Sequence, residues 1–219
     1  MFGYPICLEL AGRRVVVVGT GAVAMGKVEG LLSGGADDVL VVAEGPARRL
    51  AELEQDPRVR VERRAFRPED LDGAFLCIAS AWAKRRRDAI ARAGRARGVL
   101  VNVVDDVPNC DWAAPAVVRR GDLVLAMATG GASPALARRL KDDLSARFGE
   151  HWGPLLELLR EVREETLALL PDIAERSRRW QLALDLEEAE KLVEAGCARE
   201  LRERLLHRLV GDRLKEGSA

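Results

Sequence analysis

Two groups of residues in this chain have the types and the spacing that binding and catalysis require. The first is Gly19-Thr20-Gly21-Ala22-Val23-Ala24, a run of the form Gly-x-Gly-x-x-Ala. Glycines at this spacing let the chain turn sharply and bring backbone N–H groups close to a ligand. The second is the carboxylate pair Asp105-Asp106, which follows an apolar run and contains the best candidates for a general base.

The glycine run is positioned by the elements on either side of it. The four valines at 15–18 suit a strand that is buried on both faces. From Val23 onward apolar residues recur at helical spacing, so the run leads into a helix N-terminus, where backbone N–H groups attract anions. In this strand–turn–helix context the run is the dinucleotide-binding fingerprint with alanine in third place. A tight turn that binds no ligand is the alternative.

Strands and helices alternate through the first half of the chain, which predicts an α/β fold with a Rossmann-type parallel sheet. The predicted strands are residues 14–18, 39–43, 59–65, 74–80 and 98–104, with a further strand within 1–10, and the predicted helices begin near residues 23, 46 and 83. Ligands of such sheets bind beyond the carboxyl ends of the strands. Asp105-Asp106 therefore share one sheet edge with the glycine run, although Asp106 can instead cap the turn before Pro108.

Glu44 follows the second predicted strand, near the place where dinucleotide folds put an acid on the adenosine ribose. An acid there favours NAD over NADP as the cofactor. A solvated loop glutamate is the alternative, because the offset from the glycine run is slightly long.

The alternation stops after residue 111, and a different kind of segment follows. Residues 116–118 and 123–127 flank a turn and predict an antiparallel hairpin. A second glycine-rich turn then leads into a helix, with Ser133 as its N-cap and Pro134 as its first residue. A hairpin and one helix bury little apolar surface on their own, so we expect this segment to form a homodimer with a second copy.

The chain is thus expected to have three parts: a Rossmann domain at 1–112, a dimerisation segment at 113–148 and a helical domain at 149–219. Apolar periodicity predicts three helices in the last part, with breaks at Pro171 and Gly196. The dense Arg/Glu pattern on their outer faces needs no ligand.

Composition argues against several classes of protein. The 35 basic and 35 acidic residues balance, so no overall positive charge points to nucleic acid. The basic run 84–87 allows a nucleic-acid contact, but its helical spacing favours a solvated outer face. The four cysteines are scattered without a Cys-x-x-Cys pair, which argues against a zinc site and favours a reducing, cytoplasmic setting. No apolar run is long enough to cross a membrane, and no signal sequence is recognised.

Three ordered motifs carry a resemblance to a known family. They are Asn-Val-Val-Asp-Asp at 102–106, Ala-Pro-Ala-Val-Val-Arg-Arg-Gly-Asp-Leu at 114–123 and Thr-Gly-Gly-Ala-Ser-Pro-Ala-Leu-Ala-Arg at 129–138. From about Tyr4 to Phe148 the chain resembles the siroheme synthase family, in its precorrin-2 dehydrogenase module. The resemblance implies a homodimer with an interlocked dimerisation segment. It also implies NAD-dependent oxidation of precorrin-2, a tetrapyrrole, to sirohydrochlorin, with iron insertion in some members.

The resemblance also implies roles for single residues. Asp105 corresponds to the family's essential aspartate, and we expect it to be the general base that takes a proton from the substrate. Thr129 corresponds to a serine or threonine that is phosphorylated in some members. The expected cofactor-binding residues are Gly19, Thr20, Gly21, Ala22, Val23, Ala24, Glu44, Ala79, Ser80 and Asn102. The expected substrate-binding residues are Thr129, Gly130, Gly131, Ser133, Arg119 and Arg138, of which the arginines suit the carboxylates of a tetrapyrrole.

Two features leave alternatives open. After the fourth strand the family usually carries threonine and then asparagine or aspartate near the cofactor, whereas this chain has Ala81 and Trp82. The two histidines, His151 and His207, both fall in the helical tail, so the sequence predicts a dehydrogenase without a dedicated metal site. The alternatives are a bifunctional dehydrogenase and ferrochelatase, and a non-catalytic dimer that senses NAD.

Overall fold

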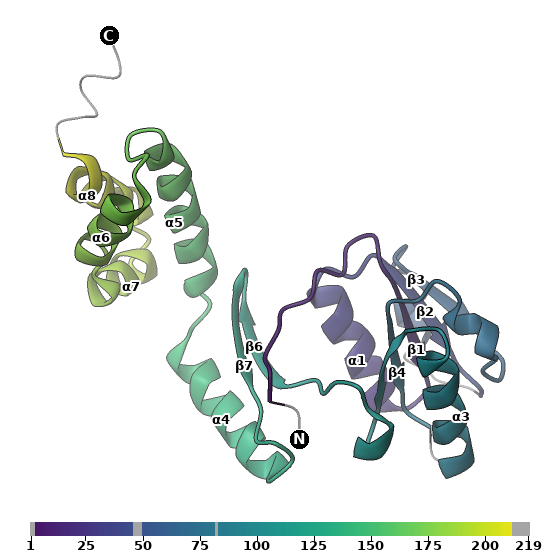
Figure 1. The fold of residues 1–219 in the computed structure, drawn as a ribbon. Helices are drawn as coiled ribbons and strands as arrows, with labels where there is room; N and C mark the ends of the chain where they lie inside the picture. The colour runs from purple at the N-terminus through teal and green to yellow at the C-terminus, as the bar shows by residue number, and fades with distance from the viewer. Residues whose placement is uncertain (1–2, 46–49, 82, 212–219) are drawn as a thin grey trace. The chain divides into compact units, whose positions relative to one another are not determined.

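The computed structural model describes residues 3–45, 50–81 and 83–211. The chain divides into two compact units, Met1–Ala114 and Pro115–Ala219 (Figure 1). All but the first two residues of the predicted dimerisation segment, and the whole predicted helical domain, fall in the second unit, and the boundary between them stays a prediction. No helix among the described residues is long and apolar enough to cross a membrane.

The first unit is built on a five-stranded sheet of order β3-β2-β1-β4-β5, in which every strand pair is parallel. The strands are β1 (Arg14–Val18), β2 (Asp38–Val42), β3 (Val59–Glu62), β4 (Leu76–Ala79) and β5 (Leu100–Val103). The helices are α1 (Ala22–Ser33), α2 (Leu50–Leu53) and α3 (Lys84–Arg95), with short 3-10 helices η1 (Pro68–Leu71) and η2 (Val107–Asn109). The predicted Rossmann-type parallel sheet is confirmed.

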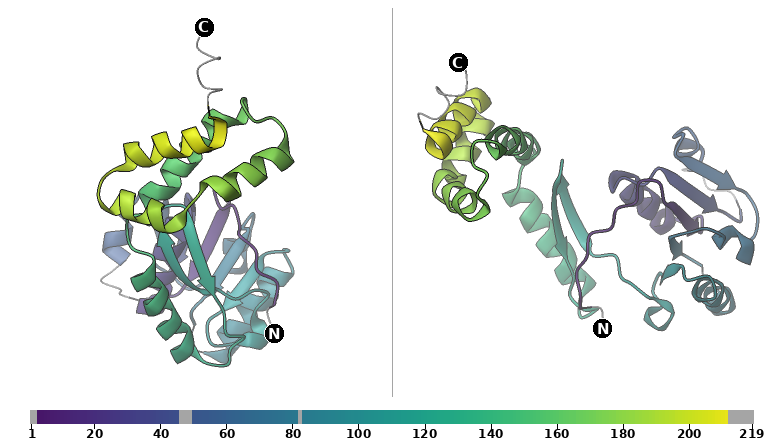
Figure 2. Two further views of the ribbon diagram at one scale, coloured as in Figure 1. Left: turned by 90° about the vertical axis from the view of Figure 1, so that its left-hand side faces the viewer. Right: turned by 45° about the horizontal axis from the view of Figure 1, so that its top comes forward.

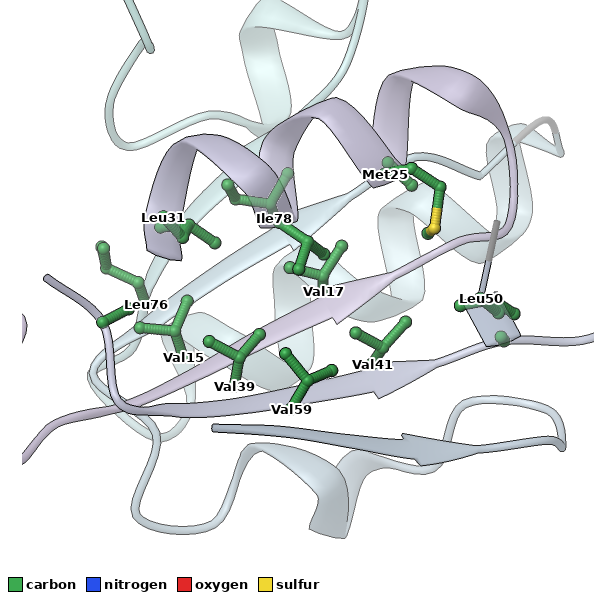
Figure 3. Packing of buried hydrophobic residues seen from close by; sticks show 14 of the residues in the cluster. Val15, Val17, Met25, Leu31, Val39, Val41, Leu50, Val59, Leu76 and Ile78 are labelled. Atoms are coloured by element: carbon green, nitrogen blue, oxygen red, sulfur yellow. The ribbon is translucent and has the colours of Figure 1, made fainter. Parts of the chain in front are cut away.

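Strand β1 lies at the centre of the sheet because both of its faces are apolar. Val15 and Val17 belong to one buried cluster, which α1 covers (Figure 3). Val16 and Val18 belong to a second buried cluster, which α3 covers. Successive side chains of a strand point to opposite faces, so an unbroken valine run is what a strand between two helical layers requires.

Two predictions near the N-terminus need comment. The predicted strand within residues 1–10 is wrong, because the described residues from Gly3 onward have no regular secondary structure and belong to neither sheet. Most of their side chains are exposed and only Leu10 is buried, so the alternating apolar residues of this segment are not packed against a neighbouring strand. The helix predicted from residue 46 is the short α2, and residues 46–49 lie outside the described part of the chain.

The second unit begins with an antiparallel hairpin, as predicted. Its strands are β6 (Ala116–Arg120) and β7 (Leu123–Met127), joined by the two-residue turn Gly121-Asp122. Helix α4 (Pro134–Arg147) lies beside the hairpin (Figure 2). The predicted N-cap is also confirmed, since the Oγ of Ser133 accepts a hydrogen bond from the Leu136 N–H at 3.1 Å.

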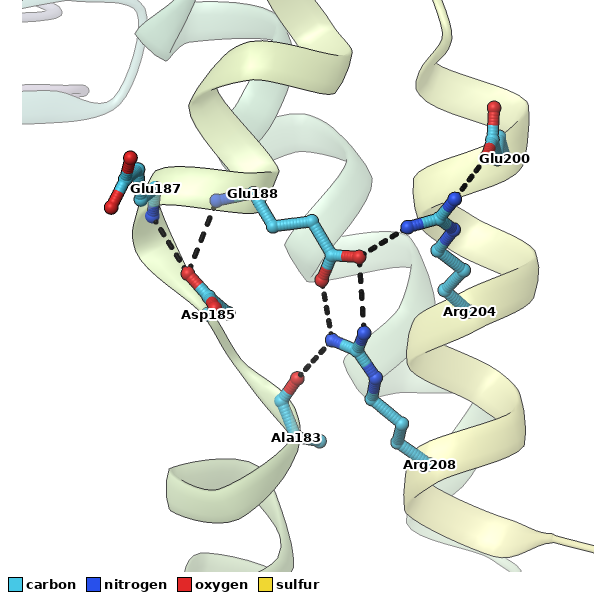
Figure 4. A network of polar contacts seen from close by, with 7 residues as sticks. All are labelled: Ala183, Asp185, Glu187, Glu188, Glu200, Arg204 and Arg208. Carbon is cyan, nitrogen blue, oxygen red and sulfur yellow. Dashed lines mark hydrogen bonds and ion pairs between the residues drawn. The ribbon is translucent and has the colours of Figure 1, made fainter.

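The residues described between Trp152 and Gly211 form four further helices, where the sequence predicts three. They are α5 (Trp152–Leu167), α6 (Ile173–Ala183), α7 (Leu186–Glu194) and α8 (Ala198–Val210). The apolar stretch expected to form one helix is interrupted before Leu186. There the carboxylate of Asp185 accepts hydrogen bonds from the N–H groups of Glu187 and Glu188 at 3.0 and 3.1 Å (Figure 4). An aspartate that satisfies free N–H groups in this way starts a new helix.

Glu188 joins α7 to α8. Its carboxylate accepts hydrogen bonds from the guanidinium of Arg208 at 2.6 and 3.0 Å, and it also pairs with Arg204 (Figure 4). These bonds from Arg208 and Arg204 hold the pKa of Glu188 below its ordinary value. The Arg/Glu pattern of this segment is therefore used in contacts between helices.

Candidate dinucleotide-binding site

The glycine run forms the turn from β1 to α1, at the carboxyl edge of the parallel sheet. A Cβ atom at Gly19 would lie 2.8 Å from the carbonyl oxygen of Ser80, and the φ of Gly19 is 146°, so only glycine fits there. The Gly19 N–H donates to the carbonyl oxygen of Val42 at 3.0 Å, and the Ser80 N–H donates to that of Val18 at 2.8 Å. The turn is thus held between the ends of β2 and β4, the two neighbours of β1.

Gly21 leaves room for a ligand at the start of α1. It is the N-cap residue of this helix, no side chain caps the helix end, and a Cβ atom at Gly21 would meet nothing within 4 Å. Ala22 and Val23 are exposed and Thr20 is half-buried, whereas Ala24 is buried against the sheet. A glycine turn before an uncapped helix N-terminus suits the pyrophosphate of a dinucleotide. The residues present therefore fit this part of the cofactor.

The sheet order places this turn at the point where ligands of open α/β sheets bind. The chain passes from β1 to β2 and β3 on one side, and then to β4 and β5 on the other. The crevice at such a switch point lies beyond the ends of β1 and β4. Ala79, the last residue of β4, is buried, and its carbonyl oxygen accepts the Val104 N–H at 2.9 Å. Backbone contacts of Ala79 and Ser80 with the cofactor stay predictions.

Glu44 is exposed and lies just beyond β2. Its carboxylate pairs with the guanidinium of Arg86 in the first turn of α3, which nothing in the sequence indicates. Within the same basic run Lys84 pairs with Asp88, so these charges are balanced on the surface of the unit. The contact of Glu44 with the cofactor ribose stays a prediction.

The loop after β4 is the part in which this chain departs from the family's usual residues. Ala81 is half-buried and packs against the second apolar cluster. Trp82 lies outside the described residues.

Asp105 lies two residues beyond the end of β5 and is exposed. Its φ is 58°, and no other non-glycine residue in the described part of the chain has a positive φ. Such a conformation costs free energy and persists where the surrounding structure imposes it, which is common at functional sites. Asp105 thus presents an exposed carboxylate, in an imposed conformation, near the edge where a ligand is expected.

Asp106 is a turn residue instead. It is the N-cap residue of η2, and its Oδ2 accepts a hydrogen bond from the side chain of Asn109 at 3.0 Å. The same oxygen lies 3.0 Å from the Nε of Arg87 on α3. Asn109 also donates to Asp88 of that helix at 2.8 Å. Asp106 thus occupies the predicted cap position before Pro108, but its side chain makes no capping hydrogen bond there and contacts Asn109 and Arg87 instead.

Asn102 and Cys110 also hold this segment to β5. The Asn102 side chain is buried and donates to the carbonyl oxygen of Trp112 at 2.9 Å. The Cys110 thiol donates to the carbonyl oxygen of Val103 and accepts its N–H, both at 3.1 Å. Burial raises the pKa of Cys110 above its ordinary value. A direct role of Asn102 in cofactor binding stays a prediction, and its amide already has a partner within the fold.

The predicted substrate-binding residues all belong to the second unit. The hydroxyl of Thr129 donates to the carbonyl oxygen of Ser133 at 3.3 Å and accepts its N–H at 3.4 Å, which closes the turn before α4. Gly130 and Gly131 have φ values of 61° and 84°, in the region that glycine adopts most readily.

Two of the predicted substrate-binding residues are arginines with available guanidinium groups. Arg119 on β6 and Arg138 on α4 are exposed, and neither forms an ion pair with another described residue. Arg120 behaves differently, because it donates to the carbonyl oxygens of Phe148 and Ser145 at 2.8 and 3.1 Å. Arg120 therefore joins the hairpin to the end of α4.

The described residues contain no group of three or more His, Cys, Asp or Glu side chains that could hold a metal ion. His151 lies between two carboxylates of α7, 3.7 Å from Glu190 and 3.4 Å from Glu194. His207 lies in α8. Both histidines are thus part of the helical region.

Two residues of this site could not be found from the sequence. In the sequence, Arg87 is one of several basic residues in a run, and nothing distinguishes it as a partner of Asp106. The only feature that could have pointed to Asn109 is its position three residues after Asp106. Their partners come from different elements, and only the folded chain shows which side chains meet.

Comparisons with known proteins agree with a dinucleotide-binding fold. Residues 6–116 match the family model described as "Putative NAD(P)-binding". Siroheme synthase 1 of Pectobacterium atrosepticum is 35% identical over 94% of this chain, and siroheme synthase 1 of Yersinia enterocolitica is 34% identical over 97%. The chain spans only 42% and 45% of these two relatives.

A solved structure named "SirC, precorrin-2 dehydrogenase" has the same fold. Its TM-score is 0.74 and its sequence identity 28%, and the match covers 93% of this chain and 98% of that one. The predicted resemblance to siroheme synthases is confirmed, and it extends beyond Phe148 into the helical tail. The matched family segment contains both the glycine turn and Asp105. The chain therefore belongs to the NAD(P)-binding family whose model covers residues 6–116.

Proposed function

We propose that this chain is an NAD-dependent dehydrogenase that oxidises precorrin-2 to sirohydrochlorin. The observation that carries the proposal is the likeness to a precorrin-2 dehydrogenase over 98% of that chain, at 28% identity. The names of the siroheme synthase relatives support the same kind of substrate, although this chain spans about two fifths of their length. The glycine turn and the exposed Asp105 supply the two groups that the reaction needs.

The cofactor is proposed to lie across the carboxyl ends of β2, β1 and β4, where most of the expected cofactor-binding residues are. Backbone N–H groups of the glycine turn and of the α1 N-terminus would hold its pyrophosphate, and Glu44 its adenosine ribose. Bound NAD supplies a hydride acceptor. A carboxylate at position 44 favours NAD, because it can accept hydrogen bonds from ribose hydroxyls and repels a 2′-phosphate.

Asp105 is proposed to be the base. Removal of two hydrogens from the substrate as a hydride and a proton requires a group that accepts the proton. Asp105 can do so because it is exposed near the sheet edge where the cofactor is expected. Asp106 is less suited, because its carboxylate is already engaged by Asn109 and Arg87.

Arg119 and Arg138 are proposed to bind the carboxylates of the tetrapyrrole. A guanidinium without an internal partner can form two parallel hydrogen bonds with a carboxylate. The turn at Thr129–Ser133, with its two glycines, is proposed to lie against the substrate as well.

A homodimer is proposed for the second unit. Helix α4 has no buried residue, and Leu136 and Leu140 on it are 49% and 38% exposed. An isolated two-stranded hairpin is marginally stable in water, so a second copy of the segment is the partner expected to cover these residues. The cytoplasm stays the expected compartment.

Iron insertion is a second candidate activity, because relatives of this chain are named siroheme synthases. The test uses the purified chain under anaerobic conditions with precorrin-2, with and without NAD, followed by ferrous iron. The proposal expects sirohydrochlorin only when NAD is present. Faster formation of siroheme with the protein than without it would establish the second activity. Absence of sirohydrochlorin although NAD binds would contradict the dehydrogenase.

A further inference from the structure

The left-handed conformation of Asp105 needs support from the residues around it. Its backbone is anchored on both sides, since the Val104 N–H donates to the carbonyl oxygen of Ala79 at 2.9 Å and the Asp106 N–H donates to that of Val103 at 3.2 Å. On the far side of Asp105, the carbonyl oxygen of Asp106 accepts the Asn109 N–H at 2.9 Å and the Cys110 thiol at 3.4 Å, and the side chain of Asp106 contacts Asn109 and Arg87. The conformation of Asp105 thus depends on what holds Asp106.

The carboxylate of Asp106 is largely buried and needs compensation. Its side chain is only 13% exposed. A carboxylate at such a position is stable only when opposite charge and hydrogen-bond donors surround it. Asn109 supplies one donor at 3.0 Å, but an amide carries no charge.

Arg87 supplies the charge. It lies in the first turn of α3, its side chain is 24% exposed, and its Nε lies 3.0 Å from the Oδ2 of Asp106. This Nε is buried and forms no directed hydrogen bond with another described residue, so the contact is a pairing of charges.

The other charged groups around this loop already have partners. Asp88 pairs with Lys84 and accepts a hydrogen bond from Asn109, and these two partners lower the pKa of Asp88. Asp111 pairs with Arg95. Arg87 is therefore the cation that contacts Asp106 in the described part of this unit.

We propose that Arg87 is a positioning residue for Asp105. By neutralising Asp106, it holds the loop of residues 105–110 in the conformation that presents the Asp105 carboxylate to the substrate. Arg87 itself need not touch the substrate or the cofactor. The effect on turnover rests on the proposed function, whereas the effect on the loop does not.

The test combines amide hydrogen exchange with steady-state kinetics on the full chain. The variants are Arg87→Gln, which removes the charge, Arg87→Lys, which keeps it, and Arg87→Gln combined with Asp106→Asn, which removes both charges. Arg85→Gln is the matched control, because Arg85 lies on the same helix, is exposed and has no partner among the described residues.

In Arg87→Gln we expect the N–H groups of Asp106, Asn109 and Cys110 to exchange about tenfold faster or more, with the amides of β1 unchanged. We expect kcat to fall by about 10- to 100-fold, because misplacing a catalytic group by about 1 Å has an effect of this size. The KM for NAD should stay within about twofold. Arg87→Lys should recover most of both losses, and the double variant should exchange more slowly in this loop than Arg87→Gln alone.

Unchanged exchange in Arg87→Gln would overturn the proposal. So would faster exchange with unchanged kcat, or a failure of Arg87→Lys to recover either loss. An inactive wild-type chain would contradict the proposed function instead, and hydrogen exchange would still decide whether Arg87 holds the loop.

Discussion

At the scale of single residues, two adjacent carboxylates take different roles because their surroundings differ. Asp105 is exposed and held at a φ of 58°, whereas Asp106 is engaged by Asn109 and Arg87. The pair itself makes either residue a candidate base, and the family resemblance points to Asp105. The contacts of Asp106 make it a structural residue and leave Asp105 as the proposed proton acceptor.

Replacing Asp105 with asparagine should abolish most turnover while sparing the fold. Asparagine keeps the size of the side chain and tolerates a positive φ, but it cannot accept the proton. We expect kcat to fall by about 10²- to 10⁴-fold, the usual contribution of a general base, with the Kd for NAD within about twofold. Glu69→Gln, at an exposed position of η1, is the control. Normal turnover in Asp105→Asn would remove the residue from the mechanism.

The Glu44–Arg86 pair predicts how cofactor preference can be changed. Glu44→Gln removes the negative charge that would repel a 2′-phosphate and releases Arg86 to bind one. We expect the ratio of Kd values for NADP and NAD to shift toward NADP by about tenfold, the scale of one charged hydrogen bond. Isothermal titration measures both constants. Adding Arg86→Gln to this variant should cancel part of the gain, and an unchanged ratio in Glu44→Gln would show that Glu44 does not contact the ribose.

At the scale of elements, the two glycines of the turn between β1 and α1 have different expected roles. Gly19 is required by the fold, and Gly21 leaves space for the ligand. Gly19→Ala places a Cβ atom 2.8 Å from the Ser80 carbonyl oxygen at a φ that disfavours alanine, so we expect about 1–3 kcal/mol of lost stability. Gly21→Ala has free space and a φ of −75°, so the fold should tolerate it. Its methyl group would nevertheless obstruct a pyrophosphate.

Thermal unfolding and NAD titration of these two variants test the assignment. We expect Gly19→Ala to lower the unfolding temperature, and Gly21→Ala to weaken NAD binding at an unchanged unfolding temperature. Wild-type NAD affinity in Gly21→Ala would mean that the cofactor does not lie against this turn.

The sequence predicts best those elements that depend on a local pattern of residues. The valine run of β1, the glycine turn and the Ser133 cap each depend on residues a few positions apart, and all are found where expected. The break at Asp185 was missed, because an aspartate within an apolar helical pattern can lie on its solvent face or cap a new helix, and the periodicity is similar in both cases.

The missing N-terminal strand and the Arg87–Asp106 contact have another cause. A strand exists only if a neighbour offers free N–H and C=O groups, and an ion pair forms only if two elements meet. Both depend on which segments lie side by side in the folded chain. The residues next to each position in the sequence do not reveal this.

At the scale of the whole molecule, paired carboxylates predict how stability depends on pH. The pKa of Asp56 is lowered to about 2 by Arg58, and Arg147 and Arg208 lower those of Glu190 and Glu188. Because these pKa values are lower in the folded chain, the carboxylates stabilise it above their unfolded values of about 4, and this contribution is lost as pH falls through the folded values.

The unfolding temperature should therefore change little between pH 7 and 5 and fall steeply between about pH 4 and 2, as circular dichroism can record. Glu188→Gln should lower the unfolding temperature at pH 7 and reduce its loss on acidification. An unfolding temperature that rises between pH 5 and 3 would contradict this distribution of charge.

The central claim is that one sheet edge binds NAD and oxidises precorrin-2. Its most direct test is the amount of NADH formed per precorrin-2 consumed by the purified chain, measured anaerobically together with the sirohydrochlorin spectrum. We predict equal amounts of NADH and sirohydrochlorin. Binding of NAD without formation of NADH in the presence of precorrin-2 would contradict the claim, and would leave the chain as a dinucleotide-binding protein without this activity.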